Sequence, residues 1–273
     1  MSLFASLLPG DGWEPVSGGE SATEVFRRGD VFAKCCGVAG VDELIAERDR
    51  VEWLAGTSVP GARVLDWIEW SEGAGGADGS GGARGADGSR GAALLTSAVP
   101  GVAAVELPWS EKLVAGFADA LRAVHSLPVE SCPFLRPLPD VIAQAEDVVR
   151  RGAVNPDFLR EDVQAVPPAE LLARIQAEAP EIAAKAAGDL VVCHGDACLP
   201  NFLFDPSTLE LTGVIDVGRL GVADRYTDLS LVPAQLHDEW SVDASAFFAA
   251  YGLPEPDAQR LAFYLLLDPL TWG

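Results

Sequence analysis

The chain has 273 residues, of which 49% are hydrophobic, and it carries 41 acidic against 19 basic side chains, for a formal net charge of −22. This length and apolar content are enough for a substantial core, in one large domain or in two lobes. A strongly negative potential repels nucleic acid phosphates and anionic membranes and attracts cations. We therefore expect a cationic ligand, no nucleic acid and no membrane, although acidity for the sake of solubility alone is the alternative.

The cysteines favour a reducing compartment. They are Cys35, Cys36, Cys132, Cys193 and Cys198, an odd number without a CxxC pair. Cys193 and Cys198 flank His194, so a zinc site or a Cys/His nucleophile is an alternative, weakened by the lack of a second cluster with metal-ligand spacing. Residues 1–8 have no basic region of a signal peptide, and no apolar run approaches the roughly 18 residues of a membrane span. We expect a cytoplasmic protein, and its oligomeric state is left open.

The first hundred residues indicate short strands punctuated by glycine, together with one helix. The helix is expected over Val41–Ala55, where good helix formers precede Gly56, a residue type typical of helix C-caps. Strands are expected at Arg63–Trp70 and Ala93–Ala98, and Pro100-Gly101 then breaks the pattern. This part of the chain therefore predicts a small lobe rich in β-structure.

A tract of glycine, alanine, serine and aspartate separates the two expected strands. Within it, residues 76–84 (GADGSGGAR) are nearly repeated by residues 85–93 (GADGSRGAA). A segment with so little apolar surface cannot offset its ordering entropy, so we interpret it as a flexible hairpin loop. Phosphate binding by these glycines is the alternative, but no helix start follows them. Any further role of Gly73 to Gly91 is left open.

The rest of the chain is mostly helical, with a few short strands. In Glu111–Ser126, apolar residues recur at spacings of four, four and three, which is the stripe of a helix packed on a core. The stripe consists of Leu113, Phe117, Leu121 and Val124. Further helices are expected at Asp140–Arg151, Pro168–Lys185, Asp224–Leu236, Val242–Tyr251 and Asp257–Leu267.

The most informative pattern lies in the last third of the chain. A short apolar strand, LVVC, leads into His194-Gly195-Asp196, Asn201 follows five residues after the aspartate, and a β-run over Gly213–Ile215 leads into Asp216. Phosphoryl transfer needs a carboxylate that orients or deprotonates the attacking hydroxyl, and oxygen ligands that hold Mg²⁺ against the nucleotide phosphates. Asp196 can supply the first, and Asn201 with Asp216 the second. Ordinary turn carboxylates are the alternative for either aspartate alone.

The motif HGDxxxxN followed by IDxG resembles the catalytic and metal-binding loops of aminoglycoside phosphotransferases, which share the eukaryotic protein-kinase fold. The resemblance covers nearly the whole chain, from Gly18–Ser21 to the C-terminal FYLLLDPLTWG. It implies an α+β, bilobal protein-kinase-like fold with a small β-rich N-lobe and a larger helical C-lobe. The implied division is a nucleotide-binding lobe over residues 1–97, a connector over residues 98–101 and a helical catalytic and substrate lobe over residues 102–273.

The resemblance implies a nucleotide site in the N-lobe, with ATP and Mg²⁺ as cofactors. Lys34, at the end of the strand-like VFAK, is expected to contact the α- and β-phosphates, and Glu47 in the following helix is expected to hold it by an ion pair. The segment SGGES is similar to the phosphate-covering loop of the family, in which Ser21 approaches the nucleotide. Adenine is expected to bind backbone groups between Ser97 and Val99.

Further residues are assigned to the C-lobe by the same resemblance. Arg219 matches a family arginine near the transferred phosphate, where it would stabilise the transition state, and a structural salt bridge is the alternative. Asp228 is expected to be a buried support for the catalytic loop. Asp238 and Asp268 match substrate-binding positions of the wider family, and the terminal carboxylate of Gly273 is expected to add to them.

The resemblance is nearest to the streptomycin 3''-phosphotransferase branch, through the segments VFRRGD, AVNPDFL, VVCHGD, CLPN, GRLG and FYLLLDPLTWG. It implies ATP-dependent phosphorylation of the 3''-hydroxyl of streptomycin, a polycationic antibiotic, and hence resistance. A same-fold kinase for another small hydroxylated metabolite or antibiotic stays open, as does a non-catalytic nucleotide-binding scaffold. A protein that only binds nucleotides would not need all of the predicted catalytic and metal-binding residues, so their joint presence argues against the scaffold. These residues are Lys34, Glu47, Asp196, Asn201 and Asp216. All assignments require that the side chains of residues 34, 196, 201 and 216 converge on one nucleotide–metal pocket.

Overall fold

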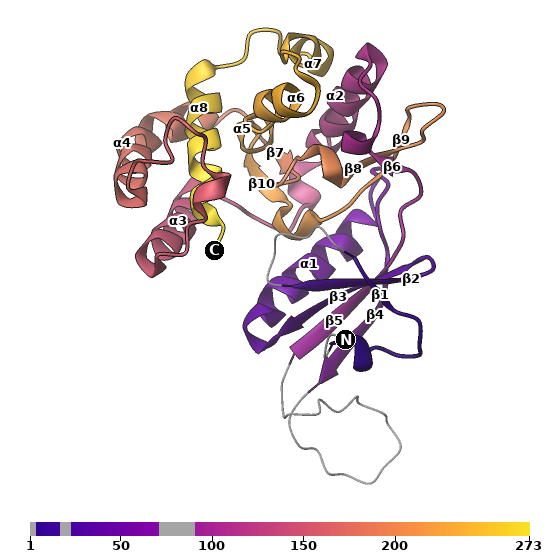
Figure 1. Cartoon of the computed structure of the whole chain (residues 1–273). Coiled ribbons are helices and arrows are strands. Elements are labelled where there is room, and N and C mark those ends of the chain that lie inside the picture. The colour runs from indigo at the N-terminus through magenta and orange to yellow at the C-terminus, as the bar shows by residue number, and fades with distance from the viewer. Residues whose placement is uncertain (1–3, 17–22, 71–90) are drawn as a thin grey trace. The chain divides into compact units, whose positions relative to one another are not determined.

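The structure, a computed structural model, describes residues 4–16, 23–70 and 91–273. These residues form two compact units, whose elements are labelled in Figure 1. The first unit comprises the described residues up to Pro100 together with Thr212–Gly218, and the second comprises Gly101–Leu211 and Arg219–Gly273. The expected phosphate-covering loop with Ser21, and most of the glycine-rich tract, lie outside the described residues.

An antiparallel sheet forms the body of the first unit, with its five strands in the order β1-β2-β3-β5-β4. The strands are β1 (Glu14–Pro15), β2 (Glu24–Arg28), β3 (Val31–Gly37), β4 (Val64–Trp70) and β5 (Gly91–Ser97), and the helix is α1 (Val41–Leu54). A tight turn joins β2 to β3, because Arg28 pairs with Val31, and Gly29 takes the positive φ of 59° that such turns favour. The predicted helix and the two predicted strands are confirmed, with ends shifted by one or two residues.

Side chains of β3 alternate between the two faces of the sheet. Cys35 packs into a buried cluster that includes Phe26, whereas Cys36 packs with Leu44 of α1. Because side chains two residues apart share a face, Lys34 lies on the face of Cys36, which α1 covers. The strand therefore directs this lysine toward the helix.

A short segment from much later in the chain completes the first unit. The amide of Val214 in β9 (Leu211–Val214) donates to the carbonyl of Pro60 at 2.9 Å, and Val214 forms a parallel bridge with Gly61. The predicted division instead assigned all of residues 102–273 to one lobe. The difference arises from these backbone hydrogen bonds, which tie Thr212–Gly218 to the first unit.

Helices dominate the second unit. They are α2 (Glu111–His125), α3 (Leu138–Arg151), α4 (Pro168–Ala186), α5 (Tyr226–Leu229), α6 (Val232–Trp240), α7 (Ser245–Tyr251) and α8 (Ala258–Leu267). Its antiparallel strand pairs are β7 (Leu190–Cys193) with β10 (Gly221–Asp224), and β6 (Val102–Ala103) with β8 (Phe202–Phe204). All four residues of the predicted α2 stripe are buried, so that helix is confirmed. Every helix among the described residues is too short or too polar to cross a membrane.

One predicted helix is wrong in its bounds. A single helix was expected over Asp224–Leu236, but Asp224 ends strand β10, α5 is one turn long, and α6 starts only at Val232. Asp224 pairs with Leu190 of β7 and its carboxylate accepts hydrogen bonds from Arg260. These long-range partners, which the local pattern does not show, place Asp224 in the strand and not in a helix.

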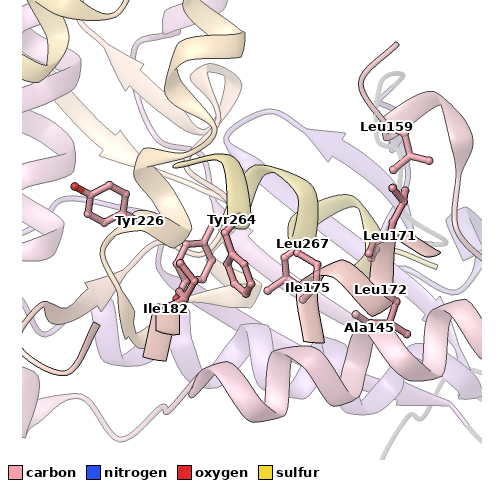
Figure 2. Packing of buried hydrophobic residues seen from close by; sticks show 11 residues of the cluster. Ala145, Leu159, Leu171, Leu172, Ile175, Ile182, Tyr226, Tyr264 and Leu267 are labelled. Atoms are coloured by element: carbon pink, nitrogen blue, oxygen red, sulfur yellow. The ribbon is translucent and has the colours of Figure 1, made fainter. Parts of the chain in front are cut away.

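A hydrophobic core of the second unit lies between α3, α4 and α8. Figure 2 shows Ile175 of α4 beside Leu267 of α8, and Ala145 of α3 contributes to the same buried cluster. Burial of each large aliphatic side chain stabilises the fold by about 1.5–3 kcal/mol. This packing holds α8 in place, and with it the start of the C-terminal segment that follows.

Candidate active site

Three charged side chains meet in the first unit. The Nζ of Lys34 lies 2.8 Å from Oε2 of Glu47 and 2.8 Å from Oδ1 of Asp216. Burial opposes the charge on Lys34, but attraction to the two carboxylates outweighs it, and the pKa of Lys34 is raised. Burial also raises the pKa of Glu47, against the pull of the lysine. The expected ion pair is therefore present, and Lys34 is a fixed positive charge between two carboxylates.

The backbone at Asp216 is unusual. This residue follows β9 and has a φ of 59°, in the left-handed region that residues other than glycine seldom adopt. Such a conformation costs of the order of 1–3 kcal/mol and is typical of functional sites. The side chain is 50% exposed, so the carboxylate can accept a further partner beside Lys34.

A second group of polar side chains lies in the loop between β7 and β8. Nδ2 of Asn201 donates to the carbonyl oxygen of Asp196 at 2.9 Å and to its Oδ2 at 3.0 Å. Sγ of Cys198 donates to the other carboxylate oxygen, Oδ1, at 3.0 Å. The carboxylate of Asp196 is thus oriented by two residues of its own loop, and it remains partly exposed.

Asp228 of α5 supports this loop. Its two carboxylate oxygens accept hydrogen bonds from the amides of His194 at 2.7 Å and Gly195 at 2.8 Å. Nε2 of His125 lies 2.9 Å from Oδ2 of Asp228, and Nδ1 of the same ring lies 2.6 Å from the hydroxyl of Tyr251. Burial alone would raise the pKa of Asp228, but the hydrogen bonds and the neighbouring imidazoles outweigh it and the pKa is lowered. Asp228 is the buried support that the sequence predicts.

The same network bears on the zinc alternative. His125, Cys193 and Asp228 offer potential ligand atoms within 4.8 Å of one another. Each of them is already in a hydrogen bond, and Sγ of Cys193 lies 3.4 Å from a backbone carbonyl. Cys198, the other cysteine of the sequence pattern, contacts Asp196 instead. A metal ion would have to break these bonds, so the geometry favours the hydrogen-bonded network.

A cavity of about 170 Å³ borders this network at His125 and Tyr251. Arg122 and Arg225 also line it, and each already pairs with an aspartate. Asp196 is not among the lining residues. The cavity therefore does not mark the candidate active site.

Gly195 of the HGD motif is required by its backbone and by its surroundings. Its φ is 84°, and a Cβ atom there would come 2.2 Å from the carbonyl oxygen of Arg219 and 2.8 Å from Nη1 of Arg136. Nη1 of Arg136 itself donates to that carbonyl at 2.8 Å. Glycine therefore permits a close approach of the Asp196 loop to the segment that begins at Arg219.

The C-terminal segment holds the side chain of Arg219. Nη1 donates to Oγ1 of Thr271 at 2.9 Å, Nη2 donates to the Thr271 carbonyl at 3.0 Å, and the guanidinium lies 3.4 Å from the ring centroid of Trp272. Asp268 lies 3.5 Å from Nη1 and accepts a hydrogen bond from the Trp272 indole at 3.1 Å. These contacts favour the structural alternative for Arg219.

Asp268 is also an electrostatic neighbour of the catalytic loop. Burial raises the pKa of Asp268, Arg219 opposes this increase, and the charge of Asp196 adds to it. Two carboxylates that repel each other in this way form a region that favours a bound cation.

The remaining predicted residues are spread over the chain. Ser97 ends β5, its Oγ accepts a hydrogen bond from a backbone amide at 3.0 Å, and Val99 follows it. Asp238 is exposed on α6, and the carbonyl of Gly273 accepts a hydrogen bond from an arginine at 2.9 Å. Ser21 lies outside the described residues. Lys34, Glu47 and Asp216 meet in the first unit, and Asp196 and Asn201 meet in the second. The convergence of these two groups on one pocket stays a prediction.

Sequence reasoning missed the side chains that hold the catalytic loop. Oε1 of Gln235 in α6 accepts from the Leu199 amide at 2.6 Å, and its Nε2 donates to the Ala197 carbonyl at 3.3 Å. In the chain, 36 residues separate Gln235 from Leu199, so no local pattern indicates this contact. Cys198 lies only two positions after Asp196, so the HGDxC spacing could have indicated that the two side chains are in contact.

Solved structures share this arrangement of strands and helices. The aminoglycoside phosphotransferase APH(3'')-Id from Streptomyces rimosus matches with a TM-score of 0.82 and 46% identity, over 96% of this chain and 93% of its own. A choline/ethanolamine kinase family protein from Mesorhizobium loti matches with a TM-score of 0.58 at 19% identity, over 96% of this chain and 81% of its own, a likeness of fold alone. The fold is that of the kinase-like phosphotransferases, with mixed α+β structure.

Sequence comparison narrows this class. The model of the phosphotransferase enzyme family matches residues 12–264. Streptomycin 3''-kinase from Streptomyces griseus is 47% identical over 274 residues, covering 97% of this chain and 94% of the relative. An aminoglycoside 3'-phosphotransferase from Streptomyces fradiae is 39% identical over 286 residues, covering 98% of each. The chain belongs to the phosphotransferase enzyme family and is an enzyme of the aminoglycoside phosphotransferase type.

Proposed function

We propose that the protein transfers the γ-phosphoryl group of ATP to the 3''-hydroxyl of streptomycin. The observation that carries the proposal is the 47% identity, over almost the entire chain, to the streptomycin 3''-kinase of Streptomyces griseus. The Streptomyces rimosus enzyme, matched here at 45% identity and a TM-score of 0.83 over 99% of this chain and 98% of its own, has been solved in complex with ADP and streptomycin. A net charge of −22 suits a polycationic acceptor. Phosphorylation would weaken ribosome binding of the antibiotic and so confer resistance.

Asp196 acts as the catalytic base in this proposal. Its carboxylate is partly exposed and held at Oδ2 by Asn201, so it can orient an acceptor hydroxyl. Asp196 takes the hydroxyl proton as the acceptor oxygen bonds to the γ-phosphorus and the bond from that phosphorus to the ADP oxygen breaks. Positioning and electrostatics supply most of the rate enhancement.

Lys34, held between Glu47 and Asp216, presents a fixed positive charge suited to nucleotide phosphates. Asp216 and Asn201 each offer an oxygen of the kind that suits Mg²⁺: Asp216 has carboxylate oxygens, and Asn201 turns its amide nitrogen to Asp196 with its amide oxygen left for a cation. Bound Mg²⁺ neutralises charge on the phosphates. The proposal requires that both groups of residues act on one nucleotide.

Asp268 is the strongest candidate for recognition of the cationic acceptor. It is an electrostatic neighbour of Asp196, and the indole of Trp272 fixes its carboxylate. Asp238 and the terminal carboxylate of Gly273 are further candidates. Arg219 contributes by holding the segment that carries Asp268, and a direct role at the transferred phosphate is the alternative.

Mass spectrometry of streptomycin after incubation with the enzyme and MgATP tests the proposal. We expect a mass increase of one phosphoryl group, located by fragmentation on the sugar that bears the 3''-hydroxyl. Strong turnover of choline or homoserine with none of streptomycin would overturn the choice of substrate. If no acceptor tested is phosphorylated, the alternative of a non-catalytic nucleotide-binding scaffold is favoured.

A second candidate is phosphorylation of another aminoglycoside at a 3'-hydroxyl. It is favoured by the 39% identity, over 98% of the chain, to the aminoglycoside 3'-phosphotransferase of Streptomyces fradiae. A panel of aminoglycosides with and without a 3'-hydroxyl, assayed beside streptomycin, separates the two. A kcat/KM for streptomycin at least tenfold above that of every 3'-acceptor supports the first candidate.

A further inference from the structure

We propose that Cys198 is a positioning residue that holds the carboxylate of Asp196 in its reactive orientation, an inference that rests on the proposed function. Sγ of Cys198 lies 3.0 Å from Oδ1, and Nδ2 of Asn201 lies 3.0 Å from Oδ2. Each carboxylate oxygen thus has a separate donor within the same loop. With one donor, the carboxylate could still rotate about its single hydrogen bond. Two donors, one on each oxygen, fix the orientation of its plane.

The thiol is the donor in this contact. An ionised carboxylate can only accept hydrogen bonds, and a thiol is a weak donor as long as it keeps its proton. The Sγ–Oδ1 distance of 3.0 Å therefore places the thiol proton between the two atoms, which suits a positioning role.

The backbone on both sides of Cys198 is held by α6. The Gln235 side chain accepts from the amide of Leu199 and donates to the carbonyl of Ala197, which are the two neighbours of Cys198 in the chain. The amide of Cys198 itself donates to the carbonyl of Asp196 at 2.8 Å. The backbone of Cys198 is thus fixed both from α6 and within its own loop, so a single side-chain torsion is enough to bring the thiol to Asp196.

Cys132 offers a matched control. Its thiol is buried in the second unit and donates to the backbone carbonyl of Phe134 at 3.6 Å. Cys132→Ala and Cys198→Ala remove the same atoms from the same unit. The two variants lose the same side-chain volume. A lower turnover of Cys198→Ala than of Cys132→Ala is therefore attributed to the lost contact with Asp196.

The kinetic test compares Cys198→Ala, Cys198→Ser and Cys132→Ala with the wild type, using streptomycin and MgATP. We expect Cys198→Ala to lower kcat about tenfold with the KM for MgATP within about twofold, because the lost hydrogen bond serves the reacting group and not the nucleotide. Cys198→Ser keeps a donor and should stay within about threefold of the wild type. Equal kcat values for Cys198→Ala and Cys132→Ala would overturn the inference.

Thiol reactivity tests the contact without catalysis. We expect Asp196→Asn, which removes the negative charge beside the thiol, to accelerate alkylation of Cys198 by iodoacetamide at pH 8.5 about tenfold, measured by peptide mass spectrometry with Cys132 as the internal reference. If the wild-type enzyme phosphorylates streptomycin but Asp196→Asn leaves the alkylation rate of Cys198 unchanged, the inference about Cys198 is overturned and the proposed function stands. Failure of the wild type to phosphorylate any acceptor would overturn the proposed function, and with it the catalytic role of Cys198.

Discussion

The two groups of candidate site residues are held in different ways. In the first unit, Lys34, Glu47 and Asp216 hold one another by charge, with side chains that are 15% to 50% exposed. In the second unit, the loop of Asp196 is held by hydrogen bonds that its backbone amides donate to Asp228, whose side chain is completely buried. The first arrangement can exchange partners with a charged ligand, whereas the second is complete before any ligand arrives.

This difference suits the chemistry expected of each group. The Asp216 side chain is half exposed, so its ion pair with Lys34 contributes little to stability and can give way to a charged ligand, whereas the Lys34–Glu47 pair is mostly buried and holds the lysine. A buried carboxylate that accepts from two backbone amides fixes the loop, and a displacement of about 1 Å in a reacting group can cost a hundredfold in rate. Residues of the first group should therefore affect activity more than stability, and supports of the second group should affect both.

The largest effect on activity is expected for Asp196→Asn. Loss of the catalytic base should lower kcat by about 10³-fold, while folding and nucleotide binding persist, because Asn201 and Cys198 still surround a side chain of the same shape. Turnover, circular dichroism and calorimetric titration with ATP measure these three properties. A kcat within tenfold of the wild type would remove Asp196 from the mechanism.

Asp228→Ala should have the next largest effect and separates the two groups most clearly. It leaves the amides of His194 and Gly195 and the ring of His125 without their buried acceptor, so we expect the free energy of unfolding to fall by about 3 kcal/mol and turnover to fall with it. Urea denaturation measures the first quantity. Asp119→Ala, which removes a largely exposed carboxylate, is the control and should change stability little.

The pH dependence sharpens this prediction. Because the pKa of Asp228 is lowered in the folded protein, its stabilising contribution is fully present above the unfolded value of about 3.9 and is lost as the pH falls below that value through the folded pKa. The stability difference between the wild type and Asp228→Asn should therefore be constant from pH 6 to 8 and shrink below about pH 4. A difference that grows on acidification would contradict the assigned charge state.

Lys34→Ala should lower kcat/KM for ATP about a hundredfold and destabilise the fold less than Asp228→Ala, because one of the two carboxylates that pair with Lys34 is half exposed. Nucleotide titration and urea denaturation of the same variant test both parts. Lys34→Arg is the charge-preserving control and should recover only part of the activity, since a planar guanidinium differs from an ammonium in shape. Destabilisation as large as that of Asp228→Ala would break the contrast between the two groups.

The smallest effect is expected for acceptor recognition. Asp268→Asn should raise the KM for streptomycin about tenfold and leave the KM for ATP unchanged, because the amide keeps an acceptor for Trp272 but loses the charge. Steady-state kinetics in each substrate measure the change. Asp238→Asn, at an exposed position, is the matched comparison, and an equal or larger effect there would shift substrate binding to α6.

Much of the fold could be predicted from local pattern. The α2 stripe follows from helical periodicity, the bounds of α1 follow to within one residue from the helix formers that precede Gly56, and the HGDxxxxN spacing indicates which side chains share one loop. Local pattern failed at Asp224, which pairs with β7 and binds Arg260 instead of starting a helix. It also could not assign residues 212–218 to the first unit, because backbone hydrogen bonds to Pro60 decide that placement.

The class of chemistry was predicted from the HGDxxxxN and IDxG motifs together with the family resemblance that they carry. The groups that hold these side chains follow from the folded chain: His125 reaches Asp228 across 103 residues, and Gln235 reaches Leu199 across 36. The physical reason is that periodicity and spacing reflect the backbone geometry of one element. A buried hydrogen bond between elements depends on packing that brings distant donors and acceptors together.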